Sequence, residues 1–336
     1  MTKSTKLPVL PLREPFGRLA SYRLRVSLLE QCQFRCLYCL PGAVNPYTPR
    51  ADWLSVEEHA RLAPFFAQRG AHQIRFTGGE PLLRDDVADI IAAWRAGAPE
   101  ASLALTTNAQ RLGKWFQPLQ DAGLERLTIH IDSLDPTTYA RLMGEGAHPN
   151  DIIELAKAAK DYFGEVKLNV VAQKGENDHE FPRFIELSSA LGVQVRFIEL
   201  MNTGSAGDYV KRTFMTGKEI RETLGQRGPV VPLGRAHQSD PAALYRDEAT
   251  GVTFGVIASD SEPFCGDCNR LRLTAQGRLR GCLYEAGGVP LGPMVRANAR
   301  DAVIEATLDS ALGEKRSHHP LAAPHRAPFS MADVGG

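Results

Sequence analysis

Six cysteines fall into two groups of three, and their spacing is the strongest chemical signal in the sequence. The first group has the pattern C-x3-C-x2-C (Cys32, Cys36, Cys39), and the second has C-x2-C-x13-C (Cys265, Cys268, Cys282). Clustered cysteines in a chain of this length are typical of metal or redox sites, because disulfides are rare in reducing compartments. Each group offers three thiolates, whereas a closed tetrahedral zinc site needs four ligands.

The first group suits a four-iron cluster better than a zinc ion. Three thiolates hold three irons of a cubane and leave the fourth iron open to a small molecule. For the second group two alternatives stay open. A second four-iron cluster would offer an open iron to a substrate nitrogen or oxygen, whereas zinc would need a distant histidine such as His237, His318 or His319.

Two arginines directly follow Cys268, in the segment C-N-R-L-R. Arg270 and Arg272 are two residues apart, so on a strand both side chains point to the same side. A pair of guanidinium groups suits a phosphate or the edge of a purine. A solvated basic strand edge is the alternative interpretation.

The elements that position these residues alternate between strands and helices up to about residue 201. Six apolar segments predict strands, each separated from the next by a helical stretch: 23–30, 73–79, 102–108, 125–132, 165–173 and 194–201. This alternation predicts a parallel sheet covered by helices. An open doubly wound sheet and a curved barrel both fit, and both place ligands at the carboxyl ends of the strands.

The composition changes at both ends of this repeating region. Residues 1–20 are rich in proline and polar residues and predict an N-terminal arm. We expect the barrel or sheet to occupy residues 21–205, and residues 206–336 to form a turn-rich C-terminal region around the second cysteine group. Within that region, the sequence predicts a hairpin that turns at 276–277 and a helix at about 298–313.

The overall composition excludes several classes of protein. The 39 Lys and Arg residues balance 39 Asp and Glu residues, and 43% of the chain is hydrophobic, as in ordinary globular proteins. A net charge of zero argues against a nucleic-acid or acidic-membrane binder, although a compact basic pocket is compatible with it. The apolar runs are far shorter than the ~18 residues of a membrane span, and the N-terminus shows no export signal. We therefore expect a cytoplasmic protein with neither nucleic acid nor a membrane as partner.

The first cysteine group after strand one, with G-G-E-P (78–81) after strand two, resembles the radical S-adenosylmethionine enzymes. This resemblance implies an α/β fold, an incomplete (β/α)6 TIM-like barrel. It also implies that the first cysteine group holds a [4Fe–4S] cluster whose open iron binds S-adenosylmethionine. Gly78, Gly79 and Glu80 would then bind the methionyl amine, and Tyr38 would lie beside the adenine.

A more specific resemblance, to the GTP 3′,8-cyclases of molybdenum-cofactor biosynthesis, runs from about residue 20 to the last residue. Matching segments are IRFTGGEPL (74–82), RFIELMNTG (196–204), FCGDCNRLRL (264–273) and the terminal Gly335-Gly336. It implies a lyase in which a 5′-deoxyadenosyl radical abstracts hydrogen from C3′ of GTP. The ribose radical then attacks guanine C8, and the product is (8S)-3′,8-cyclo-7,8-dihydroguanosine 5′-triphosphate.

The same resemblance assigns roles to individual residues. The second cysteine group would hold a second [4Fe–4S] cluster that binds guanine. The implied GTP contacts are Arg25, Arg75, Thr106, Lys167, Arg196, Arg270 and Arg272. The implied S-adenosylmethionine contacts are Tyr38, Gly79, Glu80, His130 and Met201. Arg270, Arg272, Gly335 and Gly336 would have catalytic roles.

The resemblance also implies partners: a flavodoxin- or ferredoxin-type reductant, the downstream cyclic pyranopterin monophosphate synthase, and a second copy in a homodimer. Three positions depart from the family pattern. His130 replaces a common serine, Gln73 stands where a basic residue is expected, and Gln31 is unusual before the first cysteine. They leave open a paralogue with an altered substrate. Two further alternatives are a radical enzyme that modifies peptides and an iron–sulfur redox sensor or electron carrier.

Overall fold

The computed structural model describes residues 19–39, 49–144, 146, 148–201, 207–284, 287–313 and 315. Within these residues, twelve strands form one sheet in the order β12-β11-β10-β1-β2-β3-β4-β5-β6-β9-β8-β7. The strands are β1 (Tyr22–Ser27), β2 (Ala71–Thr77), β3 (Ser102–Thr107), β4 (Arg126–His130), β5 (Glu165–Ala172), β6 (Gln194–Glu199), β7 (Val230–Gly234), β8 (Ala243–Asp247), β9 (Thr253–Ile257), β10 (Arg270–Leu273), β11 (Arg278–Arg280) and β12 (Val289–Pro290).

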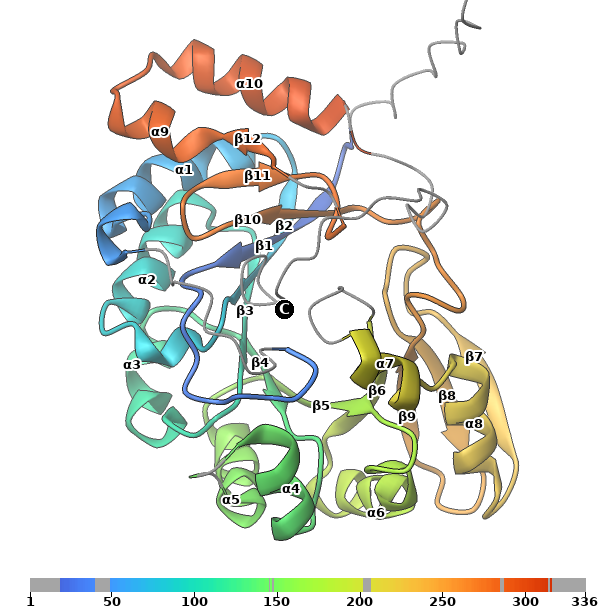
Figure 1. Ribbon diagram of the computed structural model, residues 1–336. Helices are drawn as coiled ribbons and strands as arrows, with labels where there is room; N and C mark the ends of the chain where they lie inside the picture. Colours follow the sequence, from blue (N-terminus) through green and yellow to red (C-terminus); the bar gives the residue numbers. More distant parts are fainter. Residues whose placement is uncertain are drawn as a thin grey trace, which may run out of the picture.

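The central strands β10, β1 to β6 and β9 run parallel, and antiparallel strands extend the sheet at both edges. Figure 1 shows these strands curving around a central space, with the helices of the β/α units on the outside. The helices are α1 (Val56–Gln68), α2 (Val87–Gly97), α3 (Phe116–Asp121), α4 (Pro136–Met143), α5 (Pro149–Ala158), α6 (Phe181–Leu191), α7 (Gly207–Thr213), α8 (Gly217–Gly225), α9 (Leu291–Arg296) and α10 (Asp301–Gly313). The expected incomplete barrel is confirmed.

Alternation along the strands separates the helix-covered face from the interior. On β1, Leu24 and Val26 are fully buried in the hydrophobic core, whereas Arg23 and Arg25 line a central cavity. Successive residues of a strand point to opposite faces, so an apolar residue alternates with a polar one. Each β/α unit therefore supplies one apolar face to the core and one polar face to the interior.

The region after Met201 is more regular than the sequence indicated. The segment expected to be turn-rich contains α7, α8 and the strands β7 to β9, and β9 pairs in parallel with β6. Its turn residues are accommodated at an edge, because the β7–β8 pairing shifts register between Pro232 and Gly234. The predicted hairpin is confirmed as β10 and β11, and the predicted helix as α10.

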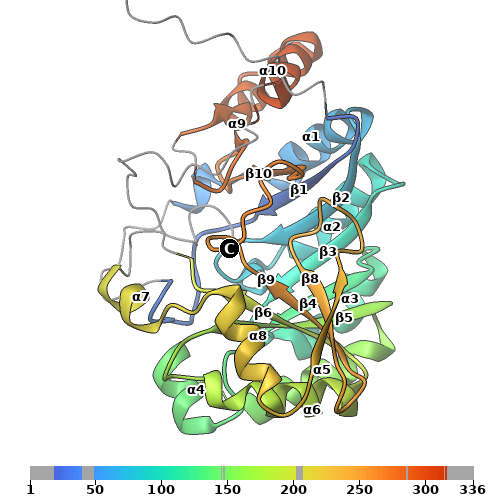
Figure 2. The same cartoon turned by 90° about the vertical axis from the view of Figure 1, so that its right-hand side faces the viewer.

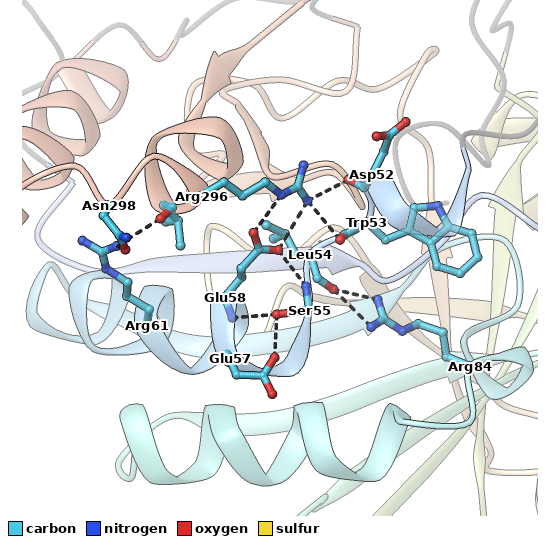
Figure 3. A network of polar contacts seen from close by, with 11 residues as sticks. Asp52, Trp53, Leu54, Ser55, Glu57, Glu58, Arg61, Arg84, Arg296 and Asn298 are labelled. Carbon is cyan, nitrogen blue, oxygen red and sulfur yellow. Dashed lines mark hydrogen bonds and ion pairs between the residues drawn. The ribbon is translucent and has the colours of Figure 1, made fainter.

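A hydrogen-bond network fastens α9 to the beginning of α1 (Figure 3). Arg296 Nε donates to Glu58 Oε1 at 2.7 Å, and its Nη2 donates to the carbonyl oxygen of Trp53 at 3.0 Å. Glu58 also closes the capping box of α1 with Ser55. These contacts hold the C-terminal segment against the first helix, on the side of the sheet where β10 lies beside β1 (Figure 2).

Candidate active site

One cavity of about 1030 Å³ occupies the interior of the curved sheet. It is lined by residues of both cysteine groups and by every predicted site residue that the structure describes. The predicted Gly335 and Gly336, and the histidines at 318 and 319, lie outside the described residues. Segments that are far apart in sequence therefore meet in a single chamber.

The first cysteine group lies against the G-G-E-P turn. Gly79 N donates to Leu29 O, and Glu80 N donates to Gln31 O, both at 2.8 Å. A Cβ atom on Gly79 would lie 2.2 Å from Gln31 O, and Gly78 has a positive φ of 148°. Both positions favour glycine, because a side chain would push the turn away from the segment that leads into Cys32.

Glu80 is buried, with 1% of its surface exposed, beneath this turn. Its carboxylate accepts hydrogen bonds from Leu82 N (2.9 Å), Thr107 Oγ1 (2.7 Å) and Asn108 N (2.8 Å). Burial raises the pKa of Glu80 to about 7, against the effect of these hydrogen bonds. The carboxylate is fixed in place next to the first cysteine group, where a ligand amine could pair with it.

His130 takes part in a polar cluster that sequence analysis did not anticipate. The Tyr38 hydroxyl lies 2.7 Å from both His130 Nε2 and Asp132 Oδ2. Asp132 is fully buried, and its Oδ1 accepts from Val171 N at 2.7 Å. Burial lowers the pKa of His130, but the neighbouring Asp132 outweighs this effect and the pKa is raised. The histidine therefore orients Tyr38, which lies within the first cysteine motif.

The second cysteine group lies at the other side of the cavity, beside cations. Arg235 and Arg270 contact the Phe264 ring, with guanidinium carbons 4.7 and 4.8 Å from its centroid. Burial raises the pKa of Cys268, but Arg270 and Lys315 outweigh burial and lower the pKa to about 7. This positive environment favours the thiolate, which is the form that binds metal.

Three arginines lie in register across neighbouring strands of the interior. Arg25 pairs with Arg272 on β10 and with Arg75 on β2. Burial, together with the nearby Arg270 and Arg196, lowers the pKa of Arg25 to about 10. In the described part of the chain, Arg25 makes no hydrogen bond or ion pair. A like-charged row of this kind is suited to an anionic ligand.

The other predicted basic residues are held by polar neighbours. Arg75 Nη1 donates to Thr128 Oγ1 (2.8 Å) and Thr106 Oγ1 (3.3 Å). Lys167 forms an ion pair with Glu165, yet burial and Arg196 lower the pKa of Lys167 to about 8. These side chains converge on the cavity from β2, β5 and β6.

Sequence analysis missed three cations of the cavity, Arg23, Arg126 and Lys315. Arg23 precedes Arg25 by two residues and Arg126 precedes Thr128 by two, so strand alternation could have revealed both. Lys315 has no such signal. In the described residues, nine Lys or Arg and four Asp or Glu side chains line the cavity, although the whole chain has zero net charge.

Each cysteine group offers three thiols, the number that leaves one iron of a four-iron cluster open. Burial raises the pKa of Cys36 and that of Cys265, and a neighbouring thiol raises each further, Cys39 for Cys36 and Cys268 for Cys265. All six are free thiols. Among the described residues, no three Cys, His, Asp or Glu side chains are gathered around a single metal-ion position.

Comparison with known proteins places this geometry in a family. The Radical SAM superfamily pattern matches residues 26–188, and the Molybdenum Cofactor Synthesis C pattern matches residues 193–321. GTP 3′,8-cyclase 3 of Mycobacterium tuberculosis (strain CDC 1551 / Oshkosh) is 40% identical over 86% of this chain and 77% of its own length. GTP 3′,8-cyclase of Acidothermus cellulolyticus is 36% identical over 90% and 84%.

This chain belongs to the GTP 3′,8-cyclase family of radical S-adenosylmethionine enzymes. Membership implies a [4Fe–4S] cluster and S-adenosylmethionine, and it excludes the interpretation as an electron carrier or redox sensor. Streptococcus suis SuiB bound to S-adenosylmethionine shares the fold, with a TM-score of 0.59 and 14% identity over 86% of this chain and 68% of that chain. No helix among the described residues has the length and apolar character needed to cross a membrane.

Proposed function

We propose that this chain converts GTP to (8S)-3′,8-cyclo-7,8-dihydroguanosine 5′-triphosphate, the first step of molybdenum-cofactor biosynthesis. The observation that carries the proposal is the shared cavity, in which two cysteine groups face a strongly cationic interior. GTP brings about four negative charges, which such an interior can neutralise. The two relatives named above, at 40% and 36% identity, are both called GTP 3′,8-cyclases.

The residues near the first cysteine group bind S-adenosylmethionine. When bound, the first cluster and S-adenosylmethionine supply the radical that removes hydrogen from C3′ of GTP. Glu80 and Gly79 hold the methionyl amine, and Tyr38, His130 and Met201 complete that site. The chain contributes placement and charge, so that the reacting carbons of GTP are held in position.

The second cysteine group holds a second [4Fe–4S] cluster that binds the guanine. Its thiols lie beside Arg270, and the register of β10 and β1 brings Arg272 next to Arg25. Arg25, Arg75, Lys167, Arg196 and Arg272 bind the triphosphate, with Thr106 close to Arg75. The row of cations spans the interior from β10 to β6.

We further infer the partners of the reaction. A flavodoxin- or ferredoxin-type protein supplies the electron, and the cyclic pyranopterin monophosphate synthase takes the product. The enzyme acts in the cytoplasm, where its six free thiols stay reduced, and it forms a homodimer.

The test is anaerobic reconstitution followed by iron counting and incubation with GTP, S-adenosylmethionine and dithionite. The intact chain should bind about eight irons and form the cyclised nucleotide. A variant with Cys32, Cys36 and Cys39 replaced by Ala should keep about half of the iron and form neither 5′-deoxyadenosine nor product.

The matched variant replaces Cys265, Cys268 and Cys282 by Ala. It should also keep about half of the iron and should still form 5′-deoxyadenosine, but not the cyclised nucleotide. Tightly bound zinc in place of iron at the second group would contradict the second cluster. An intact chain that cleaves S-adenosylmethionine and leaves GTP unchanged would contradict the substrate.

A further inference from the structure

Lys315 is a buried lysine in the wall of the cavity, beyond the end of α10. Its side chain is 6% exposed. Its Nζ donates to Arg270 O and to Gly281 O, both at 2.8 Å. In the described part of the chain, no carboxylate pairs with it. Among the described residues its ammonium group is held by two carbonyls, and such a charge is costly to bury without a counter-charge.

The two carbonyls belong to the two segments that carry the second cysteine group. Arg270 follows Cys268 by two residues, and Gly281 directly precedes Cys282. The β10–β11 ladder pairs Leu273 with Leu279 and Arg272 with Arg280. Its paired residues end there, so the cysteines lie just past the open end of the hairpin.

Lys315 links the two segments at the point where the β10–β11 ladder ends. Its Nζ atom donates to Arg270 on β10 and to Gly281, which directly follows β11, and so links the two segments. The positive charge also acts on Cys265 and Cys268. When the second group holds a cluster, its thiolates supply the negative charge that the described carboxylates do not.

We propose that Lys315 is a positioning residue for the second iron–sulfur cluster. Lys315 joins the two cysteine-bearing segments and offsets the negative charge of their thiolates. This inference rests on the second cluster of the proposed function. A nearby cation makes a cluster easier to reduce, because it stabilises the added electron. The role in geometry and the role in charge are separable by experiment.

The test compares K315M, which removes both hydrogen bonds and charge, with K315R, which keeps the charge. K218M is the matched control, because Lys218 is exposed on α8, where it pairs with Glu222. In cluster-free full-length protein, K315M should increase amide hydrogen exchange at 264–273 and 279–284 by several-fold, and K218M should not. After reconstitution, K315M should release iron from the second group to a chelator several-fold faster than the parent.

The potential of the second cluster tests the charge. It should become more negative in K315M and stay near the parent value in K315R. Parent-like amide exchange in K315M, or an unchanged potential, would overturn the assignment. An intact chain that binds no iron at the second group would instead contradict the proposed function. The exchange measurement on cluster-free protein would still show whether Lys315 joins the two cysteine-bearing segments.

Discussion

Arg25 on β1 and Arg272 on β10 occupy paired positions of two adjacent parallel strands, although they lie near opposite ends of the chain. Burial lowers the pKa of Arg272 well below its ordinary value, and Arg25 lowers it further. Like charges opposite one another destabilise a sheet. The pair is therefore poised for an anion that relieves the repulsion.

We expect Arg272→Ala and Arg25→Ala each to weaken GTP binding by about 10- to 150-fold, the equivalent of roughly 1.5–3 kcal/mol per charge-assisted contact. The double variant should lose less than the product of the two factors, because each single change also removes repulsion. Arg272→Lys should be impaired, since lysine lacks the planar fork. The measurement is equilibrium binding of GTP, with Arg278→Ala at an exposed position of β11 as the control. Unchanged affinity in both single variants would assign the pair a structural role only.

Lys167 should make GTP binding sensitive to alkaline pH. Its pKa is lowered to about 8, chiefly by burial, so it loses its charge between pH 7 and pH 9. At pH 9 about one-tenth remains protonated, and affinity for GTP should fall by up to about tenfold. Lys167→Arg stays charged and should show a flatter profile. Identical pH profiles for the parent and this variant would remove Lys167 from the triphosphate site.

His130 should tune the S-adenosylmethionine site through Tyr38. The variant His130→Ser removes one of the two partners of the Tyr38 hydroxyl and leaves Asp132. Loss of one hydrogen bond of roughly 0.5–1.5 kcal/mol predicts a fall in S-adenosylmethionine affinity of about 2- to 13-fold. Iron content should not change. Stronger binding in the variant would show that histidine hinders this site.

His59 should weaken the fold in acid, independently of function. It is fully buried on α1, where Trp94 Nε1 donates to its Nδ1 at 3.2 Å, and burial together with Arg84 lowers the pKa of His59 to about 3. Below pH 6.5 the unfolded chain binds a proton at this position and the folded chain does not. The free energy of unfolding should therefore fall by about 2 kcal/mol between pH 7 and pH 5.

The comparison for His59 is His59→Asn, whose Oδ1 can still accept from Trp94. Urea unfolding of the cluster-free chain at both pH values should show about 2 kcal/mol less pH dependence in the variant. Equal pH dependence in the two proteins would mean that His59 does not govern this loss.

Deletion of Gly335 and Gly336 tests the terminal pair, which lies outside the described residues. Chain ends usually fray, yet glycine lets a backbone approach a ligand closely, and the terminal carboxylate can orient an arginine. We expect the truncated protein to keep both clusters and to form 5′-deoxyadenosine, but to lose the cyclised nucleotide. Both products are measured in parallel with the intact protein. An equal yield of cyclised nucleotide would show that the tail has no catalytic role.

The signals for the chemistry and for the central strands are local in the sequence. Cysteine spacing indicated clusters with an open iron, and the strand–helix alternation indicated six parallel strands, because both signals are local in the chain. Alternation also placed Arg270 and Arg272 on one side of a strand. These features depend on covalent spacing and backbone geometry, which a sequence displays directly.

Only the folded structure shows which residues from distant segments lie next to one another. Parallel register sets Arg25 between Arg75 and Arg272, and no local pattern reports a pairing between the two ends of the chain. The sequence analysis did not predict the edge strand β7, because its proline and glycine are typical of a turn. The segment is a strand because it pairs with β8. Lys315 lies beside the second cysteine group because α9 packs against α1 and β11, and α10 packs against α9 and ends at Gly313. These contacts depend on long-range packing, because they join residues that are far apart in the sequence.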